Sequence, residues 1–369
     1  MIFRRENIED LARGAAFLGA GGGGDPYVGC MLLQQAMLEM PEIRVISVDE
    51  VPEDALVVPT AMMGAPTVLI EKLPGGDEAR LALRRMEQEV GRPAFAVMPG
   101  EIGGLAALLP LVLAAHTGLP VVDADAIGRA VPALQMTSFH VHGLPASPVT
   151  LADEHGNTAV VRAKDDQRSE WLARSIATAM GATCQFCFCP MTGAELRRGA
   201  VRDTITNAIG IGRAIRLARA EKAGAVSGLL HYLRGTEHYR WATLLYDGKV
   251  VDLQRETRGG WAVGTIRMEP IAPFEGTLEV VFQNEHLIVR RDGRMKASVP
   301  DVIALLDRET AQPITTEGVR YGQRLKVVAT SSPRVMRTPK GLAVIGPRAF
   351  GFDEDFVPVE RLNSLEGAA

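Results

Sequence analysis

The sequence predicts two domains: an α/β N-terminal domain, in which a sheet is flanked by helices, and a β-rich, barrel-like C-terminal domain. With 369 residues, the chain is longer than one hydrophobic core usually organises, so two domains are expected. Short apolar runs alternate with helical patterns in the first half, which is typical of an α/β layer. From Trp241 onward, short strands are separated by turn dipeptides, which is typical of an all-β barrel or sandwich.

The first half contains the expected helices and strands of the α/β domain. Helical spacing extends over residues 8–18, and a second helix is expected from Pro26 to about Met40, with Asp25 as its N-cap. Further helices are expected over residues 77–90 and 103–116. Apolar runs that we expect to form strands lie at residues 43–48, 55–59, 94–98, 119–122, 149–152 and 158–162.

The second half changes from helices to strands. Helices are expected over residues 166–180 and 205–223, on either side of a cysteine-containing strand at 183–189. Tight turns between later strands are expected at Asp247-Gly248, Gly259-Gly260, Glu275-Gly276 and Asp292-Gly293. We place the α/β domain at residues 1–165, and a helical bridge with the barrel-like domain at 166–369, although the helices over 166–223 could join either body.

Composition excludes several classes of partner. The 40 Lys and Arg residues against 44 Asp and Glu give a formal charge of −4, and no basic block is long enough to bind a phosphate backbone. The longest apolar stretches, such as residues 105–115, are shorter than the roughly 20 residues that cross a bilayer. The N-terminus lacks the apolar core of a signal peptide. We therefore expect a cytoplasmic protein with no nucleic-acid or membrane partner.

Three of the four cysteines lie close together, which raises the possibility of a zinc site. Cys184, Cys187 and Cys189 fall in one expected strand, where Cys184 faces the side opposite to the other two. A structural zinc site needs four ligands, and the remaining thiol, Cys30, lies in a different element. Buried free thiols are therefore favoured over a metal site.

A run of glycines precedes the second helix. Gly21, Gly22, Gly23 and Gly24 place bare backbone N–H groups beside a helix start at Asp25, which is a suitable place for an anionic group of a substrate. The loop follows a helix, whereas nucleotide-binding glycine loops follow a strand. The alternative is a tight turn between two helices, but four glycines cost more backbone entropy than a plain turn requires.

Carboxylates follow two of the expected strands. Asp123 and Asp125 come after an apolar run, at the end of the strand where open α/β sheets place their ligands, and Arg129 would orient them or the substrate. Two adjacent carboxylates have separated pKa values, so that one can accept a proton near neutral pH. Alternatively, Asp123 caps the next element and Arg129 neutralises it. Glu101 projects from the same edge, although a carboxylate in a first helical turn also complements the helix dipole.

His140 and His142 form an HxH pair, a spacing that metallohydrolases use. In an extended segment both would face one side, where Asp123 or Asp125 would complete a ligand set, but solvated or core histidines explain the pair as well. In the β-rich half, Asn284 and Glu285 could reach the cleft, or could simply form a turn. No Gly-x-Ser-x-Gly, His-Glu-x-x-His or activated-cysteine pattern occurs in the sequence.

Five motifs occur in one order along the chain and resemble a single family. They are Gly-Ala-Gly-Gly-Gly-Gly-Asp-Pro at 19–26, Gly-Glu-Ile-Gly-Gly at 100–104, Val-Asp-Ala-Asp-Ala-Ile-Gly-Arg-Ala at 122–130, Ala-Asp-Glu-His-Gly-Asn at 152–157 and Gly-Pro-Arg-Ala-Phe-Gly at 346–351. The chain is similar in these motifs to the S-methyl-thiohydantoin desulfurase family, whose members often lie beside hydantoinase and oxoprolinase-like proteins. The resemblance implies a substrate built on a hydantoin or related ring, and an α/β domain followed by a barrel-like one.

The activity implied by the resemblance is hydrolysis of a small heterocycle, with attack of water on the ring carbon that carries sulfur and release of a thiol. From their position at the sheet edge, we assign Asp123 or Asp125 as the base, Glu101 as the proton donor and the glycine-loop amides as the substrate anchor. The alternatives are a ring-opening amidohydrolase of the hydantoinase type and a non-catalytic ligand-binding or regulatory partner. We expect a homo-oligomer, and the sequence leaves the cofactor and any metal at His140 and His142 undetermined.

Overall fold

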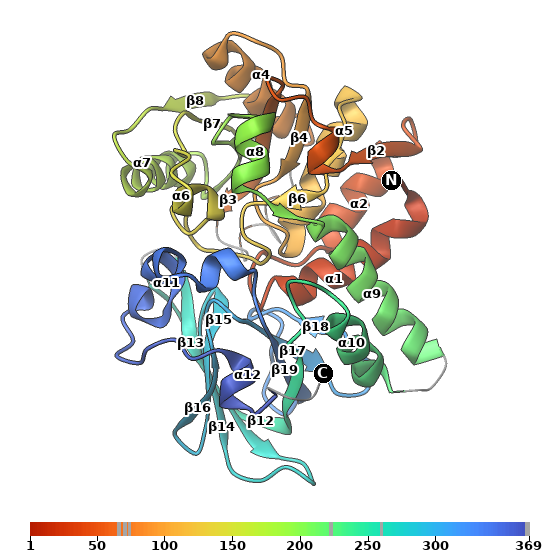
Figure 1. Cartoon of the computed structure of the whole chain (residues 1–369), viewed down its shortest axis with the longest axis vertical. Coiled ribbons are helices and arrows are strands. Elements are labelled where there is room, and N and C mark those ends of the chain that lie inside the picture. The colour runs from red at the N-terminus through yellow and green to blue at the C-terminus, as the bar shows by residue number, and fades with distance from the viewer. Residues whose placement is uncertain (65–67, 69–71, 73–74, 221–223, 259–260, 366–369) are drawn as a thin grey trace.

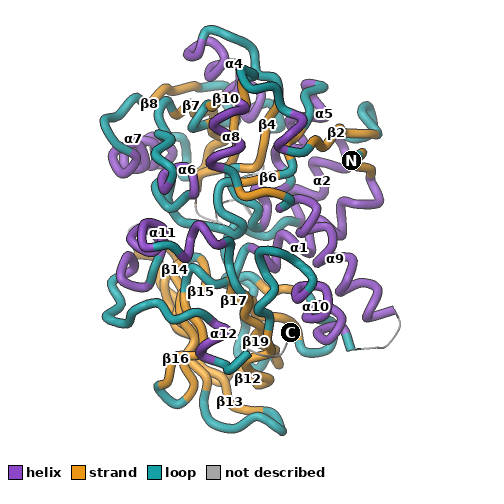
Figure 2. Tube along the Cα trace, viewed as in Figure 1, coloured by secondary structure: helices purple, strands orange, loops and turns teal. Residues whose placement is uncertain are grey.

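The protein is described by a computed structural model that covers residues 1–64, 68, 72, 75–220, 224–258 and 261–365. Two bodies lie one above the other in Figure 1, an α/β domain and an antiparallel β domain. Most of the helix lies in the α/β domain and in the segment that follows it, whereas strands dominate the other body (Figure 2). This arrangement confirms the predicted mixed α/β domain followed by a β-rich one.

The α/β domain is built on a nine-stranded mixed sheet. Its strands follow the order β1-β2-β5-β4-β3-β9-β7-β8, and β10 pairs with β3 beside this path. The strands are β1 (Ile2–Arg4), β2 (Glu42–Ile46), β3 (Leu56–Gly64), β4 (Ala96–Pro99), β5 (Val121–Val122), β7 (Val149–Ala152), β8 (Thr158–Val161), β9 (Thr183–Cys187) and β10 (Met191–Thr192). The four central strands β2, β5, β4 and β3 are parallel, so their carboxyl ends meet at one edge of the sheet.

Helices cover both faces of this sheet, as expected for parallel strands. On one face lie α2 (Tyr27–Ala36), α4 (Glu78–Val90) and α5 (Leu109–Thr117), and on the other α6 (Ser138–Val141), α7 (Asp166–Ala179) and α8 (Gly193–Gly199). Successive residues of β3 point to opposite faces of the sheet: Val57 packs against one set of helices and Val58 against the other. The apolar runs of the sequence therefore reflect burial on both faces.

The predicted elements agree with the structure to within a few residues. Helix α1 (Ile8–Leu18) and strand β7 have the predicted bounds. The cysteine strand β9 pairs with β3 and β7, so it belongs to the first sheet, and α7 packs on the same sheet. Helix α9 (Thr204–Ala220) packs on α1 and on α10 (Ala225–Arg234), and it shares a core with residues of both bodies. A two-stranded pair of β6 (Ala124–Asp125) and β11 (Val201–Arg202) precedes α9.

The second body contains an eight-stranded antiparallel sheet of order β16-β15-β14-β13-β12-β19-β17-β18. Its strands are β12 (Thr243–Arg258), β13 (Trp261–Pro270), β14 (Leu278–Gln283), β15 (Glu285–Arg291), β16 (Arg294–Ser298), β17 (Val302–Asp307), β18 (Pro313–Ile314) and β19 (Arg324–Thr330). Pairing among the described strands runs along one open path from β16 to β18, so we describe an antiparallel sheet rather than a barrel. The short helices α11 (Pro339–Ile345) and α12 (Val359–Leu362) follow it.

One predicted hairpin turn is wrong. Asp247-Gly248 lies inside the long strand β12, where Gly248 leaves room for the ring of Tyr246 against the neighbouring strand. Asp292-Gly293 joins β15 to β16 as predicted, and Glu275-Gly276 lies between β13 and β14. The predicted turn at Gly259-Gly260 lies outside the described residues. An Asp-Gly pair alone therefore does not distinguish a turn from a glycine that relieves crowding.

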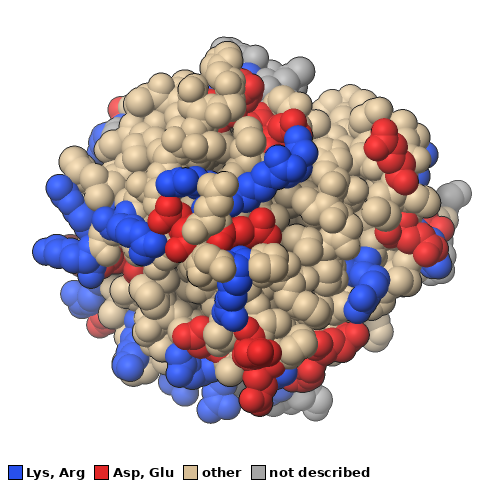
Figure 3. Space-filling view, turned by 90° about the horizontal axis from the view of Figure 1, so that it is seen from above, with Lys and Arg blue, Asp and Glu red and all other residues tan. Residues whose placement is uncertain are grey.

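No helix among the described residues combines the length and the apolar character needed to cross a membrane. The face seen from above in Figure 3 carries Lys and Arg side chains interspersed with Asp and Glu, without one continuous basic surface.

Arg129 joins the two bodies. The residue follows β6 and is 1% exposed, and its Nη1 donates to the carbonyl oxygens of Pro300 and Asp301, each at 2.9 Å, in the turn before β17. Its Nε donates to the carbonyl of Ala130 at 3.1 Å. Burial lowers the pKa of Arg129 to about 10, while the nearby carboxylates of Glu285, Asp301 and Glu101 raise it, so the side chain stays charged at neutral pH.

We expect Arg129→Met to lower the free energy of unfolding by about 3 kcal/mol or more, because two buried carbonyls lose a charged donor. Urea denaturation monitored by circular dichroism measures this change. Arg294→Met, at an exposed position of the β16 edge, is the matched control and should change stability by less than about 0.5 kcal/mol. Equal stability of the two variants would show that Arg129 does not hold the bodies together.

Candidate active site between the two domains

A cavity lies where the α/β domain meets the antiparallel sheet. It has about 770 Å³ of space free of protein atoms, part of it open to solvent. Side chains of β3, β9, α7 and the loops after β4 and β6 line it from the α/β domain, and Trp261, Asn284 and Glu285 line it from the other sheet. Clefts between domains are common ligand sites.

Glu101 reaches the cavity from the turn after β4, at the edge where the parallel strands end. Its Oε2 accepts a hydrogen bond from the backbone N–H of Val131 at 2.7 Å. Burial, followed by the neighbouring charge of Glu285, raises the pKa of Glu101 well above its usual value of 4.5. The carboxyl group is therefore suited to donating a proton near neutral pH.

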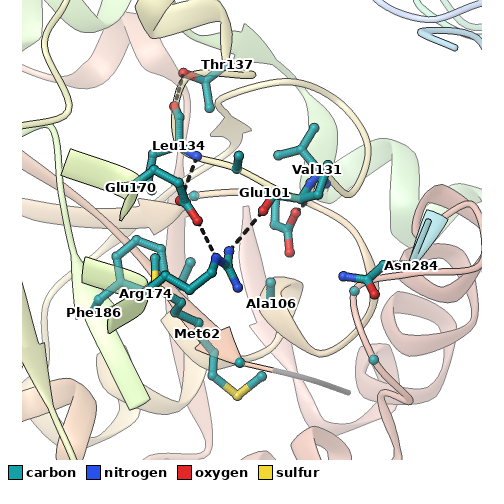
Figure 4. A pocket seen from close by; sticks show the side chains of 18 of the residues that line it. Met62, Glu101, Ala106, Val131, Leu134, Thr137, Glu170, Arg174, Phe186 and Asn284 are labelled. Carbon is teal, nitrogen blue, oxygen red and sulfur yellow. Dashed lines mark hydrogen bonds and ion pairs between the residues drawn. The ribbon is translucent and has the colours of Figure 1, made fainter. Parts of the chain in front are cut away.

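The turn between β14 and β15 supplies the other two polar groups. Asn284 has a φ of +56°, a left-handed conformation that Asn tolerates better than most residues, and this conformation places Glu285 at the start of β15. The Oδ1 of Asn284 accepts from the N–H of Ala262 at 2.9 Å, so its amide NH₂ group faces the cavity (Figure 4). Glu285 is 3% exposed, and its Oε2 has no hydrogen-bond partner among the described residues.

Glu285 and Glu101 form a coupled pair of carboxyl groups contributed by different domains. Burial raises the pKa of Glu285 to about 7, and the positive charge of Arg129 opposes that rise. Among the groups that lower the pKa of Glu285, Arg129 acts most strongly. On the pKa of Glu101, Arg129 acts less than the hydrogen bond from Val131. Because each negative charge disfavours the other, we expect the charge to reside first on Glu285 and the proton on Glu101.

The positively charged side chain of Arg174 lies on the α7 side of the cavity (Figure 4). Arg174 donates from Nε to Oε1 of Glu170 at 2.5 Å and from Nη2 to the carbonyl of Pro132 at 3.0 Å. Glu170 in turn accepts from the N–H of Leu134 at 3.1 Å. The ring of Trp261, from the antiparallel sheet, lies over the guanidinium with its centroid 4.2 Å away. These contacts hold Arg174 in one orientation at the cavity.

Apart from Thr137, most of the remaining lining is apolar. Ala61, Met62 and Met63 come from β3, Phe186 from β9, and Phe188 follows it. The rings of Phe186 and Phe188 pack at a centroid distance of 5.4 Å. The cavity thus combines a polar group of carboxyl and amide side chains with an apolar wall.

The glycine loop shapes this site by fitting against the other domain. A Cβ on Gly21 would lie 2.5 Å from the ring of His286, and a Cβ on Gly22 would overlap the carboxyl group of Glu285. The carbonyl of Ala20 accepts from the N–H of His286 at 2.7 Å, and that of Gly21 accepts from the N–H of Thr316 at 2.8 Å. The loop is therefore an interdomain contact as well as part of the cavity.

The loop residues differ in their relation to the cavity. Gly23 and Gly24 line it, with φ values of +74° and +75°, whereas Gly21 and Gly22 lie against His286 and Glu285. Asp25 accepts from the N–H of Tyr27 at 2.9 Å and borders a different groove, beside α1 and β18. The N-cap of α2 is Pro26, so the predicted helix start is displaced by one residue.

Asp123 and Asp125 do not line this cavity. Asp123 accepts from the N–H groups of Ile205 and Thr206 at 2.9 and 3.1 Å, so it caps the first turn of α9. Asp125 accepts from the N–H groups of Ile102 and Gly128 at 2.8 Å, which orders the loops that carry Glu101 and Arg129. Burial raises the pKa of both carboxyl groups, to about 7 for Asp125, and these hydrogen bonds lower it. The capping alternative holds only in part: Asp123 is a cap, but of α9 and not of the next element, and Arg129 bonds to the second domain and does not neutralise it.

The HxH segment differs from its predicted conformation. His140 and His142 fall at the short helix α6, not in an extended strand, so their side chains do not share a face. His140 Nδ1 lies 2.7 Å from Oδ2 of Asp166. Within the described part of the chain, no three His, Cys, Asp or Glu side chains are grouped so that they could hold a metal ion.

The cysteines are free thiols. Cys184, Cys187 and Cys189 are buried and Cys30 is partly buried. Burial raises the pKa of Cys30 to about 11 and that of Cys187 to about 12. The structure therefore agrees with the prediction of free thiols, and none of these groups carries the thiolate that a nucleophile requires.

Sequence reasoning identified Glu101, Asn284 and Glu285 as candidate site residues, and the structure brings these three together with Gly23 and Gly24. It missed the Glu170–Arg174 pair, Trp261 and the apolar wall. Glu170 and Arg174 are separated by four residues on α7, a spacing that also occurs in ordinary surface ion pairs. No local signal distinguishes such a pair from one that faces a cavity.

Together, the fold and the site define a two-domain protein with an interdomain cavity that contains a coupled carboxyl pair. Models of the two halves of one family match consecutive parts of the chain, the S-Me-THD-like N-terminal domain at residues 6–163 and the S-Me-THD-like C-terminal domain at 164–359. The chain therefore belongs to the S-Me-THD-like family, in agreement with the motifs that resemble S-methyl-thiohydantoin desulfurases. The family name suggests a thiohydantoin-related enzyme.

A solved structure has the same fold. The crystal structure of a protein from Chromobacterium violaceum, determined by the Northeast Structural Genomics Consortium, is 26% identical to this chain, with a TM-score of 0.81. The match covers 97% of this chain and 100% of that one. No curated protein matches the chain.

We expect Gly22→Ala to reduce turnover more than stability, because the added Cβ displaces the carboxyl group of Glu285 while the backbone φ of Gly22 is not in the left-handed region. The kcat should fall by roughly tenfold or more, since small misplacements of a reacting group are costly. Steady-state kinetics and thermal unfolding measure the two effects. Gly235→Ala, whose Cβ would meet only one atom, at 3.4 Å, is the matched control. Native kcat in Gly22→Ala would contradict the assigned role of the loop.

Proposed function

We propose that this protein is a hydrolase that removes the methylthio group from a small S-methylated thiohydantoin-type ring. The observation that supports this proposal most directly is the pair of carboxyl groups, Glu101 and Glu285, which share one cavity and both have raised pKa values. One ionised and one protonated carboxyl group are what a hydrolysis needs at neutral pH. Membership of the S-Me-THD-like family supports the class of substrate.

Glu285 is the base in this proposal. It is the carboxyl group whose charge Arg129 stabilises most, and its buried Oε2 is not occupied by a hydrogen bond from the described residues. Glu101 is the acid, because burial and the charge of Glu285 keep it protonated. Asp123 and Asp125, whose oxygens are occupied by backbone N–H groups, position the surrounding loops.

Hydrogen-bond donors around the pair suit a ring with carbonyl and nitrogen groups. The amide NH₂ of Asn284 faces the cavity, and the guanidinium of Arg174 lies at its α7 side (Figure 4). Gly23 and Gly24 bring backbone to the same cavity. Donors that are already oriented stabilise negative charge as it develops on the ring, without reorganisation.

The reaction then proceeds in two steps. Glu285 takes a proton from water as the water oxygen bonds to the ring carbon that carries sulfur, and the electron pair of the C=N bond moves to nitrogen, which takes a proton from Glu101. The intermediate collapses by forming C=O and breaking the C–S bond, and methanethiol leaves with the proton that Glu285 accepted. The products are a hydantoin-type ring and methanethiol, and Glu101 recovers its proton from the hydroxyl group of the intermediate.

We expect purified protein to release methanethiol from S-methyl-thiohydantoins, and Glu285→Gln and Glu101→Gln to lower kcat by roughly 10² to 10⁴. Both changes preserve side-chain volume and remove proton transfer. Glu285→Gln also removes a negative charge beside Arg129, so thermal unfolding is measured alongside turnover. Thiol detection and chromatography of the ring product measure the reaction. Asp123→Asn is the matched control: it should lower the melting temperature by weakening the α9 cap and retain turnover in the folded protein. Ring opening without thiol release would instead indicate an amidohydrolase.

We expect kcat/KM to follow a bell-shaped pH profile. Glu285 must be ionised, so activity rises as pH increases through about 7, the value to which burial raises its pKa. Glu101 must be protonated, so activity falls again at higher pH, above its raised pKa. Initial rates measured in a buffer series of constant ionic strength test this. Activity that is constant from pH 5 to pH 9 would remove the pair from the mechanism.

A further inference from the structure

The cavity has two chemically different sides. Glu101, Glu285 and Asn284 provide its polar side, whereas Met62, Phe186 and Phe188 line it with apolar groups. Asn284 lies across the cavity from Met62 and Phe186 in Figure 4. A ring that presents its reacting carbon to the carboxyl pair would therefore direct a substituent toward the apolar wall.

We propose that Met62, Phe186 and Phe188 form the subsite for the S-alkyl leaving group and set the length of alkyl chain that the protein accepts. This inference rests on the proposed function, which supplies the reaction, but the subsite itself is argued from the cavity. It assigns a specificity role to three residues that have no part in proton transfer.

The three side chains themselves carry no hydrogen-bond donor. Arg174, which lies beside Phe186 in Figure 4, directs its Nε to Glu170 and its Nη2 to the carbonyl of Pro132. The members of the wall carry only hydrocarbon and thioether groups. The register Ala61↔Phe186 and Met62↔Gln185 between β3 and β9 places Phe186 and Met62 on opposite faces of the sheet, so the two side chains border the cavity from either side of these strands. A thione or thiolate sulfur, which is a hydrogen-bond acceptor, would lose its solvation there. A methylthio group loses little and gains contacts of sulfur with the aromatic rings.

The wall also has a fixed depth. Phe188 is 2% exposed and Phe186 is 5% exposed, and their rings pack on one another. A Cβ on Gly100 would lie 2.7 Å from the Phe188 ring, so the turn that carries Glu101 presses directly against the wall. Phe139 supports Phe188 from behind at a centroid distance of 6.3 Å and does not line the cavity. A rigid wall discriminates between alkyl chains by their length.

The arrangement separates entry of water from departure of the thiol. Water is activated by Glu285 on the polar side, while the C–S bond breaks toward the apolar wall. Glu285 returns the proton that it removed from water to the sulfur as the C–S bond breaks. The sulfur therefore stays within reach of Glu285 while its methyl group points toward the wall, and methanethiol leaves as the neutral thiol. The balance of the reaction is the one stated for the proposed function, and the wall adds only binding of the leaving group.

The test compares kcat/KM for a series of thiohydantoins that carry S-methyl, S-ethyl and S-propyl groups, together with the unsubstituted ring. In the native protein we expect S-methyl to be preferred over S-propyl and over the unsubstituted ring, with one methylene worth roughly 10- to 200-fold. Phe186→Leu and Met62→Ala enlarge the subsite and should shift the ratio of S-propyl to S-methyl by at least tenfold toward S-propyl. Phe139→Leu, equally buried but outside the cavity, should leave the ratio unchanged.

The outcomes separate the two proposals. Thiol release with the same chain-length ratio in native protein, Phe186→Leu and Met62→Ala would overturn the subsite and leave the hydrolase intact. If no thiol is released, calorimetric binding of the same series replaces turnover. A chain-length preference in binding that shifts in Phe186→Leu supports the subsite while the proposed reaction fails, and absence of any binding overturns both. A shift in Phe139→Leu equal to that in Phe186→Leu would also overturn the assignment.

Discussion

A single buried positive charge, that of Arg129, underlies the arrangement of the two domains and their shared cavity. It is supplied by one domain, donates to two carbonyl groups of the other, and lies within range of both glutamates of the pair. Withdrawing a guanidinium from water is expensive, so it is buried only where acceptors and negative charge compensate it. Here part of the compensating negative charge comes from Glu101 and Glu285, which are also the proposed catalytic groups. Docking of the two domains therefore also assembles the site.

The glycine loop has a complementary role, one of shape. Gly21 and Gly22 are small because His286 and Glu285 occupy the volume that side chains would need. The carbonyls of Ala20 and Gly21 accept hydrogen bonds from the N–H groups of His286 and Thr316 in the second domain. Close approach of the backbone does explain the glycines, as the sequence suggested. The backbone approaches His286 and Glu285 of the protein itself. A run of four glycines does not reveal whether the neighbour is a ligand or another part of the chain.

Much of the fold follows from local patterns in the sequence. Helical periodicity predicted α1 to the residue, and the apolar run of β7 did the same for that strand. Most other elements were predicted within a few positions, because a sheet covered by helices on both faces leaves continuous apolar runs. The site is only partly local. Glu101 could be identified because it follows a strand, but Asp123 and Asp125 follow strands too, and only tertiary contacts show that backbone N–H groups occupy their oxygens. Arg174 and Trp261 contact each other across the two domains, and no local sequence pattern predicts that contact.

The two glutamates belong to different domains, and this division has a consequence for partly assembled molecules. Burial raises the pKa of both carboxyl groups, and the charge of Glu285 raises that of Glu101 further. In a chain whose second domain has not docked, both pKa values would therefore lie closer to those of exposed glutamates. Such a chain would be chemically silent toward any ring that it met. Reactivity in this protein is therefore a property of the interface between the docked domains.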